Sequence, residues 1–318
     1  MKSIAIGVDL GGTNLKALCV EQDGAILART ECPTNAEKGP DAVLQTIIRT
    51  VNQLIRDCDS ASARIIGVGI GAPGPLNPET GVVLKAPNLP GWKNIQLRER
   101  VADALKMPIK IENDANLAAL GEYWKGAGAN ASVLVCLTLG TGVGGGVIIN
   151  GRIFSGSSFI GAELGHMSIK YDGLPCGCGG YGCLEAYISA TSIIKRTTLA
   201  LERGARSSLA TIHNYDVSRL TAHDVYKAAV DGDDLARHIM EETGMLLGIG
   251  LANVGNIFNP DVVVIGGGVA GAFDILIEPA RRELQKRAMP GIMDTMTIVP
   301  AQLGSDAGSI GAAGLFFM

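Results

Sequence analysis

The strongest constraint on the fold is a pattern of strand, glycine-rich turn and strand that occurs twice in the chain. Residues 4–8 are apolar and run into the turn at residues 9–14, and residues 133–139 run into a second glycine turn at residues 140–146. Gly140 lies 129 positions after Gly11, a separation close to the length of one domain. This spacing indicates that an α/β unit has been duplicated.

Length and composition favour two compact domains that act on a small molecule. A chain of 318 residues exceeds one ordinary core, and its 43 glycines beside 4% aromatic residues predict close packing through small side chains. The net charge of -4, with no basic run, argues against nucleic acid or an anionic membrane as partner. The start of the chain carries no signal-peptide pattern, and no transmembrane stretch appears, so we expect a cytoplasmic protein with reduced cysteines.

Hydrophobic periodicity predicts alternating strands and helices along the chain. We expect strands at residues 4–8, 15–20, 25–32, 65–71, 108–112, 133–139, 147–149, 261–265 and 297–300. We expect helices at residues 43–55, 115–125, 187–203, 222–230, 233–257 and 273–287, and a last helix after residue 306. The Pro- and Gly-rich residues 72–92 are expected to form one long irregular excursion.

Both glycine turns are candidate phosphate sites. Strands and not helices follow them, which disfavours the Rossmann and P-loop motifs. Consecutive glycines still expose backbone N–H groups that can bind phosphate oxygens. Either turn alone is more typical of an ordinary hairpin, and the repetition of the pair at matching places favours phosphate binding. Asp9 would meet a phosphate-bound Mg²⁺ through water, or would cap its turn. The glycines of a third run would let a nucleoside lie against the backbone, or would serve close packing: Gly266, Gly267 and Gly268.

A cysteine-rich loop predicts a structural zinc site. Its four candidate ligands are His166, Cys176, Cys178 and Cys183. Three thiolates and an imidazole form a complete tetrahedral set, which leaves no open position for catalysis by the metal. Buried free thiols are the alternative, but such residues rarely cluster in a glycine-rich loop.

Taken together, these motifs resemble those of ROK-family sugar kinases of the bacterial glucokinase type. The resemblance covers essentially the whole chain in collinear order, and the cysteine motif with the upstream sequence Glu-Leu-Gly-His is its most specific part. It implies an α/β, actin-like ATPase (ribonuclease H-like) duplicated fold, with two domains around a cleft. It also implies ATP as phosphoryl donor and a hexose as acceptor. We expect a small domain of residues 1–115 plus 305–318 and a large domain of residues 116–304 with the zinc loop.

The resemblance assigns roles residue by residue. Asp114 matches the catalytic base, and a carboxylate after a strand is suited to accept the proton of a hexose hydroxyl. Taken without the other motifs, Asp114 would be read as the N-cap of the following helix. The residues that match sugar-binding positions are Asn88, Asn113, Asp114, Glu163, His166 and Glu185. The predicted nucleotide-binding residues are Asp9, Gly11, Gly12, Thr13, Asn14, Gly140, Thr141, Gly142, Gly144, Gly266, Gly267 and Gly268.

The expected activity is ATP-dependent phosphorylation of glucose at the 6-hydroxyl, in glycolysis. The alternatives are another acceptor (N-acetylmannosamine, N-acetylglucosamine, fructose or allose), polyphosphate as donor, or a sugar sensor without catalysis. The family also contains repressors with an N-terminal winged helix-turn-helix, and the eight residues before Asp9 leave no room for that domain. Homodimers or homotetramers are the expected assembly.

Overall fold

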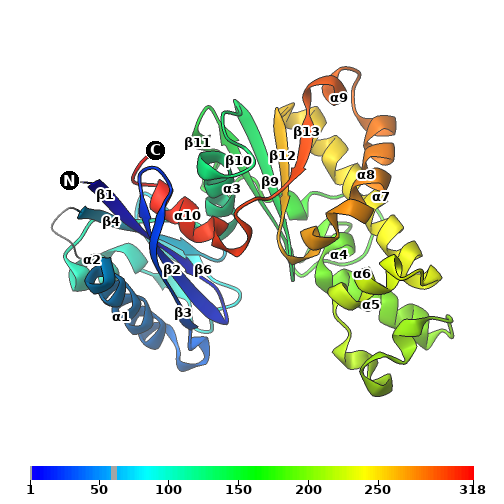
Figure 1. Ribbon diagram of the computed structural model, residues 1–318, viewed down its shortest axis with the longest axis horizontal. Helices are drawn as coiled ribbons and strands as arrows, with labels where there is room; N and C mark the ends of the chain where they lie inside the picture. Colours follow the sequence, from blue (N-terminus) through cyan, green and yellow to red (C-terminus); the bar gives the residue numbers. More distant parts are fainter. Residues whose placement is uncertain (1, 59–62) are drawn as a thin grey trace. The chain divides into compact units, whose positions relative to one another are not determined.

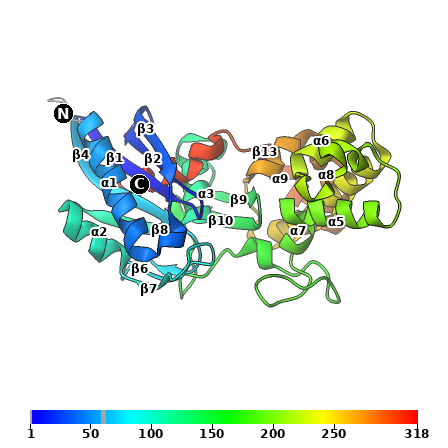
Figure 2. The ribbon, with the colours of Figure 1, turned by 90° about the horizontal axis from the view of Figure 1, so that it is seen from below.

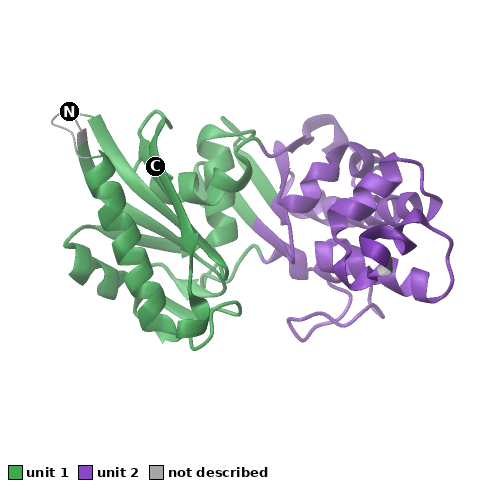
Figure 3. Ribbon diagram, turned by 60° about the horizontal axis from the view of Figure 1, so that its bottom comes forward, with its two compact units in different colours: residues 1–136, 146–162, 302–318 green, residues 137–145, 163–301 purple. Residues whose placement is uncertain are grey.

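The computed structural model describes residues 2–58 and 63–318. Two compact units account for the chain: the first contains residues up to 136 together with 146–162 and 302–318, and the second contains residues 137–145 and 163–301 (Figure 3). The domain division predicted at residues 115/116 and 304/305 remains a prediction, and the compact units divide the chain at other positions.

The first sheet has the strand order β3-β2-β1-β4-β8. Its strands are β1 (Lys2–Leu10), β2 (Asn14–Glu21), β3 (Ile26–Pro33), β4 (Ala63–Ala72) and β8 (Ile109–Asn113). β1, β2 and β3 pair as an antiparallel meander, which confirms the predicted entry hairpin, whereas β4 pairs with β1 and with β8 in parallel.

The second sheet repeats this order as β11-β10-β9-β12-β13. Its strands are β9 (Val133–Leu139), β10 (Val143–Ile149), β11 (Arg152–Ile153), β12 (Val262–Gly266) and β13 (Thr297–Pro300). β10 and β11 are antiparallel, and β12 and β13 are parallel, as are β4 and β8 at the matching places of the first sheet. The shared order of strands supports the duplication predicted from the two glycine turns.

Helices cover both faces of the first sheet (Figures 1 and 2). α1 (Pro40–Cys58) contacts β2 and β3 and carries α2 (Leu97–Leu105), while α10 (Ala307–Gly314) contacts β1 and β4 and packs on α3 (Asp114–Lys125). Alternation along β1 explains the two faces: Ile4, Ile6 and Val8 join the core that includes α1, and Ala5 joins the core of α10. The last helix therefore lies in unit 1, as the sequence predicts.

Glycine permits the close approach of α10 to this sheet. A Cβ atom on Gly69 would lie 1.9 Å from the carbonyl oxygen of Ala312, and one on Gly7 would lie 1.8 Å from that of Ser309. Since both obstacles are backbone atoms, no side-chain rotation can relieve the overlap.

We therefore expect Gly69→Ala to lower the free energy of unfolding by about 3 kcal/mol, the upper range for overpacking. Gly271→Ala is the matched control, because no atom lies within 4 Å of the added methyl group. Urea unfolding of both variants measures the difference, and equal midpoints would contradict the packing described for α10.

The remaining helices are in unit 2: α4 (Glu185–Ile188), α5 (Ala190–Glu202), α6 (Ala222–Val230), α7 (Asp234–Phe258), α8 (Phe273–Arg287) and α9 (Ile292–Thr295). The continuous helix predicted at residues 187–203 is wrong, because the Ser189 hydroxyl accepts a hydrogen bond from Ser192 N and caps a new helix there. Within the described residues, no helix is long and apolar enough to span a membrane.

The irregular excursion predicted at residues 72–92 is also wrong in part. It contains β5 (Leu76–Asn77) and β6 (Val82–Lys85), which join β7 (Lys93–Ile95) in a three-stranded antiparallel sheet. Strands of two to four residues are too short for a hydrophobic period to reveal.

Candidate active site and metal centre

Three parallel strands of unit 1 bring the first group of predicted residues to one edge of the sheet. In the register of β1, β4 and β8, Asp9 pairs with Gly71, Gly71 pairs with Glu112, and Ala72 pairs with Asn113. Asp9 and the start of α3 therefore lie where the strands end in the same direction. This is the edge at which open α/β sheets place ligands.

Asp114 is the first residue of α3, but it is not the cap of that helix. Asn113 is the N-cap: its Oδ1 accepts hydrogen bonds from Ala115 N at 2.9 Å and from Asn116 N at 3.2 Å. Asp114 Oδ1 also accepts from Ala115 N, at 2.9 Å. Since Asn113 already satisfies the first turn of the helix, capping does not explain the carboxylate at position 114.

The side chain of Glu112 holds the junction between β8 and α3 through two hydrogen bonds. It is buried, and its Oε1 accepts from Asn113 N at 2.8 Å and from Asn116 Nδ2 at 3.1 Å. Burial raises the pKa of Glu112, and these two donors oppose the shift. The side-chain nitrogen of Asn113, Nδ2, makes one long contact, 3.5 Å to Gly74 O. It can therefore still donate a hydrogen bond to a ligand.

The first glycine turn closes against the loop that carries Asn88. Gly11 N donates to Asn14 O at 3.0 Å, and the Thr34 hydroxyl donates to Gly11 O at 2.7 Å. A Cβ on Gly12 would lie 3.0 Å from Asn88 Cβ, so glycine lets the two segments meet. The structure thus brings a predicted nucleotide residue and a predicted sugar residue into contact.

Asp9 is a partly buried carboxylate near the Lys16 ammonium. Burial raises the pKa of Asp9 above its ordinary value, and the nearby Lys16 ammonium acts in the opposite direction. A bound cation would likewise favour the charged form, so this side chain fits a Mg²⁺ held through water. Thr13 and Asn14 lie beside it at the turn, where Thr13 O accepts from Thr34 N and the Asn14 amide donates to Glu31.

The second glycine turn is held by residues that follow the cysteine loop. Val143 N donates to Glu185 Oε2 at 2.9 Å, Ala190 N donates to Gly140 O at 2.8 Å, and the Thr191 hydroxyl donates to Thr141 O at 2.9 Å. Gly144 lies in β10 and not in the turn, because that strand begins at Val143.

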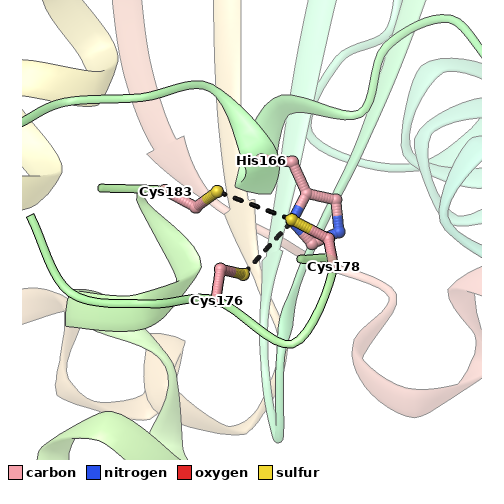
Figure 4. Close-up of side chains that lie close together, drawn as sticks. All are labelled: His166, Cys176, Cys178 and Cys183. Atoms are coloured by element: carbon pink, nitrogen blue, oxygen red, sulfur yellow. Dashed lines mark hydrogen bonds between the residues drawn. The ribbon is translucent and has the colours of Figure 1, made fainter. Parts of the chain in front are cut away.

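The four predicted metal ligands converge on one point (Figure 4). Their ligand atoms lie within 4.8 Å of one another, with 3.6 Å from Cys176 Sγ to His166 Nδ1 and 3.7 Å from Cys178 Sγ to Cys183 Sγ. Bond lengths of about 2.0–2.3 Å in a tetrahedral zinc site require ligand separations of about 3.4–3.8 Å. The donor set and these two separations therefore fit zinc, and the four ligand atoms form a candidate site for that ion.

Two of the thiols differ in pKa, and Cys176 would need a bound cation to be held as a thiolate. Burial raises the pKa of the Cys176 thiol to about 12, whereas the Gly180 N–H lowers the pKa of Cys178. His166 turns Nδ1 toward the sulfurs, so its other ring nitrogen, Nε2, is the one available to a second partner.

The three glycines at residues 266–268 have different surroundings. Gly267 has a φ of 85°, and a Cβ there would lie 2.4 Å from Leu139 O, so close packing of two strands requires this glycine. Gly266 faces Ala301, whereas nothing lies within 4 Å of an added Cβ on Gly268. Only the last of the three is therefore left for a ligand to explain.

Sequence reasoning missed a cavity of about 240 Å³ in unit 2. Thr141, Cys176 and Glu185 line it together with Thr191 and Lys195 of α5. In the sequence, Thr191 and Lys195 look like any other polar residues of a helix. Only the fold places α5 beside the second glycine turn.

Comparison with known proteins identifies the family. A model of the ROK family matches residues 5–317. The chain belongs to the ROK family. It is 38% identical to a glucokinase from Halalkalibacterium halodurans, over 98% of this chain and 94% of that protein. It is 33% identical to the solved structure of a ROK family glucokinase from Streptomyces griseus in complex with glucose and AMPPNP, with a TM-score of 0.81 and 98% of both chains covered.

The chain is also similar to a protein with another name. The chain is 31% identical to a putative xylose repressor from Caldicellulosiruptor, over 90% of this chain and 71% of that protein. These comparisons confirm the predicted family and the actin-like ATPase fold class. The roles of individual site residues in this chain remain predictions.

Proposed function

We propose that this chain phosphorylates glucose at the 6-hydroxyl with ATP as donor. Relatives named glucokinase support the class of the enzyme, an ATP-dependent sugar kinase. The observation that carries the assignment of the base is the position of Asp114 after β8, at the same edge of the sheet as Asp9 at the end of β1, with the helix capped by Asn113.

In the proposed reaction, Asp114 accepts the proton of the sugar hydroxyl while the hydroxyl oxygen forms a bond to the γ-phosphorus of ATP. The bond from that phosphorus to the bridging oxygen of ADP breaks, and the products are the sugar phosphate and ADP. The remaining backbone N–H groups of the two turns, those of Gly12, Thr13, Thr141 and Gly142, would bind the phosphate oxygens, because Gly11 N and Gly140 N already donate within their turns. Asp9 would hold a Mg²⁺ ion through water, and the ion would neutralise phosphate charge.

Sugar recognition is assigned to five side chains besides Asp114. Asn88 and Asn113 offer amide groups, Glu163 and Glu185 offer carboxylate acceptors, and His166 offers a ring N–H donor. Zinc on His166 Nδ1 would fix the proton on Nε2, which then donates to a sugar hydroxyl. The zinc ligands would be His166 with Cys176, Cys178 and Cys183.

A panel of acceptors tests the proposal. We expect ADP release with glucose to exceed that with N-acetylmannosamine, N-acetylglucosamine, fructose and allose by at least about tenfold in kcat/KM. If another hexose is preferred, the protein is still a sugar kinase, but the proposed substrate is wrong. Turnover with none of them would favour a sugar-binding protein without catalysis, a second candidate that the repressor-named relative supports. Polyphosphate in place of ATP tests the donor, and the cytoplasmic location and homo-oligomeric state stay predictions.

A further inference from the structure

The second glycine turn and the cysteine loop are joined through one carboxylate. Glu185 Oε2 accepts a hydrogen bond from Val143 N at 2.9 Å, and Glu185 Oε1 lies 3.5 Å from Cys176 Sγ. A Cβ on Gly142 would lie 2.4 Å from Glu185 Oε2, so only glycine allows the carboxylate to approach the turn so closely. All of these residues lie in unit 2.

The turn is in contact with the segments on both sides of the cysteine loop. On the upstream side, a Cβ on Gly165 would lie 1.9 Å from Val143 O, so the segment that ends at His166 packs directly on the turn. On the downstream side, Ala190 and Thr191 hold the carbonyl groups of Gly140 and Thr141.

The base of the cysteine loop is itself closed. Leu184 N donates to Met167 O at 3.0 Å, and Ser168 forms an isolated bridge with Cys183. The two segments that hold the turn are therefore the two ends of the loop that carries the sulfur ligands.

A glycine turn binds phosphate well only if its N–H groups are already oriented. Glycine loses more backbone conformational entropy than any other residue when its conformation is fixed. If that entropy is lost only when the ligand binds, the affinity for the ligand is reduced. One hydrogen bond lies within the turn, from Gly140 N to Gly142 O at 2.9 Å, and the anchors named above hold the turn from outside.

We infer that Glu185 is a positioning residue for nucleotide binding, which holds the Gly140–Val143 turn and couples it to the metal loop. The inference rests on the proposed function, because it takes the turn to bind phosphate. It goes beyond the sugar-binding role assigned to Glu185, since it makes nucleotide affinity depend on this side chain and on the metal when no sugar is present.

The test measures the Kd of AMPPNP with Mg²⁺ in the absence of sugar. We expect Glu185→Ala to weaken binding by about tenfold or more, the effect of losing a hydrogen bond to a charged group. Glu185→Gln keeps an oxygen that can accept from Val143 N, so its affinity should stay within about threefold of the wild type. If the carboxylate only repels the phosphates, both variants will bind more tightly, which overturns the inference.

Hydrogen exchange gives a second readout. Glu185→Ala should remove protection from a peptide that covers residues 137–146, while peptides from α7 exchange as in the wild type. Uniform loss of protection across unit 2 would mean general destabilisation and would overturn the inference. Should Glu185→Ala not fold, Thr191→Val replaces the hydroxyl on Thr141 O by a methyl group of similar size and should weaken AMPPNP binding in the same direction.

A separate experiment tests the coupling between nucleotide binding and the metal. Removal of zinc from the wild-type protein by a chelator should weaken AMPPNP binding, although none of the cysteines touches the nucleotide in the proposed arrangement. Tyr171→Ala is the control, because that side chain lies in the same loop and is 94% exposed. If nucleotide affinity is unchanged in every variant and after chelation, the inference is wrong. If the wild type binds no AMPPNP, the proposed function fails first.

Discussion

Replacement of Asp114 by asparagine should lower kcat by about 10²–10⁴-fold while the enzyme still binds glucose and nucleotide. An amide has nearly the same size as a carboxylate, but it cannot accept the hydroxyl proton when the phosphoryl group is transferred. The fold tolerates the change, because α3 is capped by Asn113, whose Oδ1 accepts from both Ala115 N and Asn116 N.

The measurement combines steady-state kinetics with separate titrations of glucose and AMPPNP. Asp103→Asn is the matched control, since it makes the same chemical change at an exposed position of α2 in the same unit. Parallel losses of glucose affinity, stability and kcat would instead mean that the residue only supports the helix.

The duplicated sheets could be predicted because their signals are local. Long buried strands that run into glycine turns are visible in the sequence, and the order of strands in both sheets agrees with them. The clustering of the four candidate metal ligands could also be predicted, because cysteine and histidine have few other reasons to gather in one glycine-rich loop. Their ligand atoms lie within 4.8 Å of one another, whereas zinc itself stays a prediction.

The parts that sequence reasoning missed depend on contacts between distant segments. The resemblance named Glu185 as a sugar-binding candidate, but its hydrogen bond with Val143 N joins residues 42 positions apart. Likewise, the need for glycine at position 69 comes from Ala312 of the last helix. The break at Ser189 was missed for a different reason, since a serine inside an apolar helical pattern is ambiguous between a cap and an interior residue.

Replacement of Cys178 by serine should abolish stable zinc binding and disorder the loop that contains it. Serine keeps the size of the side chain, but a neutral hydroxyl is a poor ligand in a site built from thiolates. The zinc content, expected to be about one per chain in the wild type, should fall well below that value by elemental analysis.

Loss of the metal should act on the sugar through His166. Without zinc on Nδ1, neither the orientation of the ring nor its proton on Nε2 is fixed, so glucose affinity should fall by about 10–100-fold, the usual effect of losing such support. Metal binding is also coupled to local folding, so protease should cut within residues 167–183 much faster in Cys178→Ser than in the wild type.

Cys32→Ser is the matched control, because it makes the same substitution at a half-exposed cysteine of unit 1 that is outside the ligand set. This variant should keep its zinc, its glucose affinity and the protease resistance of the loop. A Cys178→Ser protein that is free of zinc but still binds glucose as the wild type does would separate the metal from the sugar site. In that case the role of His166 would rest on its imidazole alone, and the cysteines would serve only the stability of their own loop.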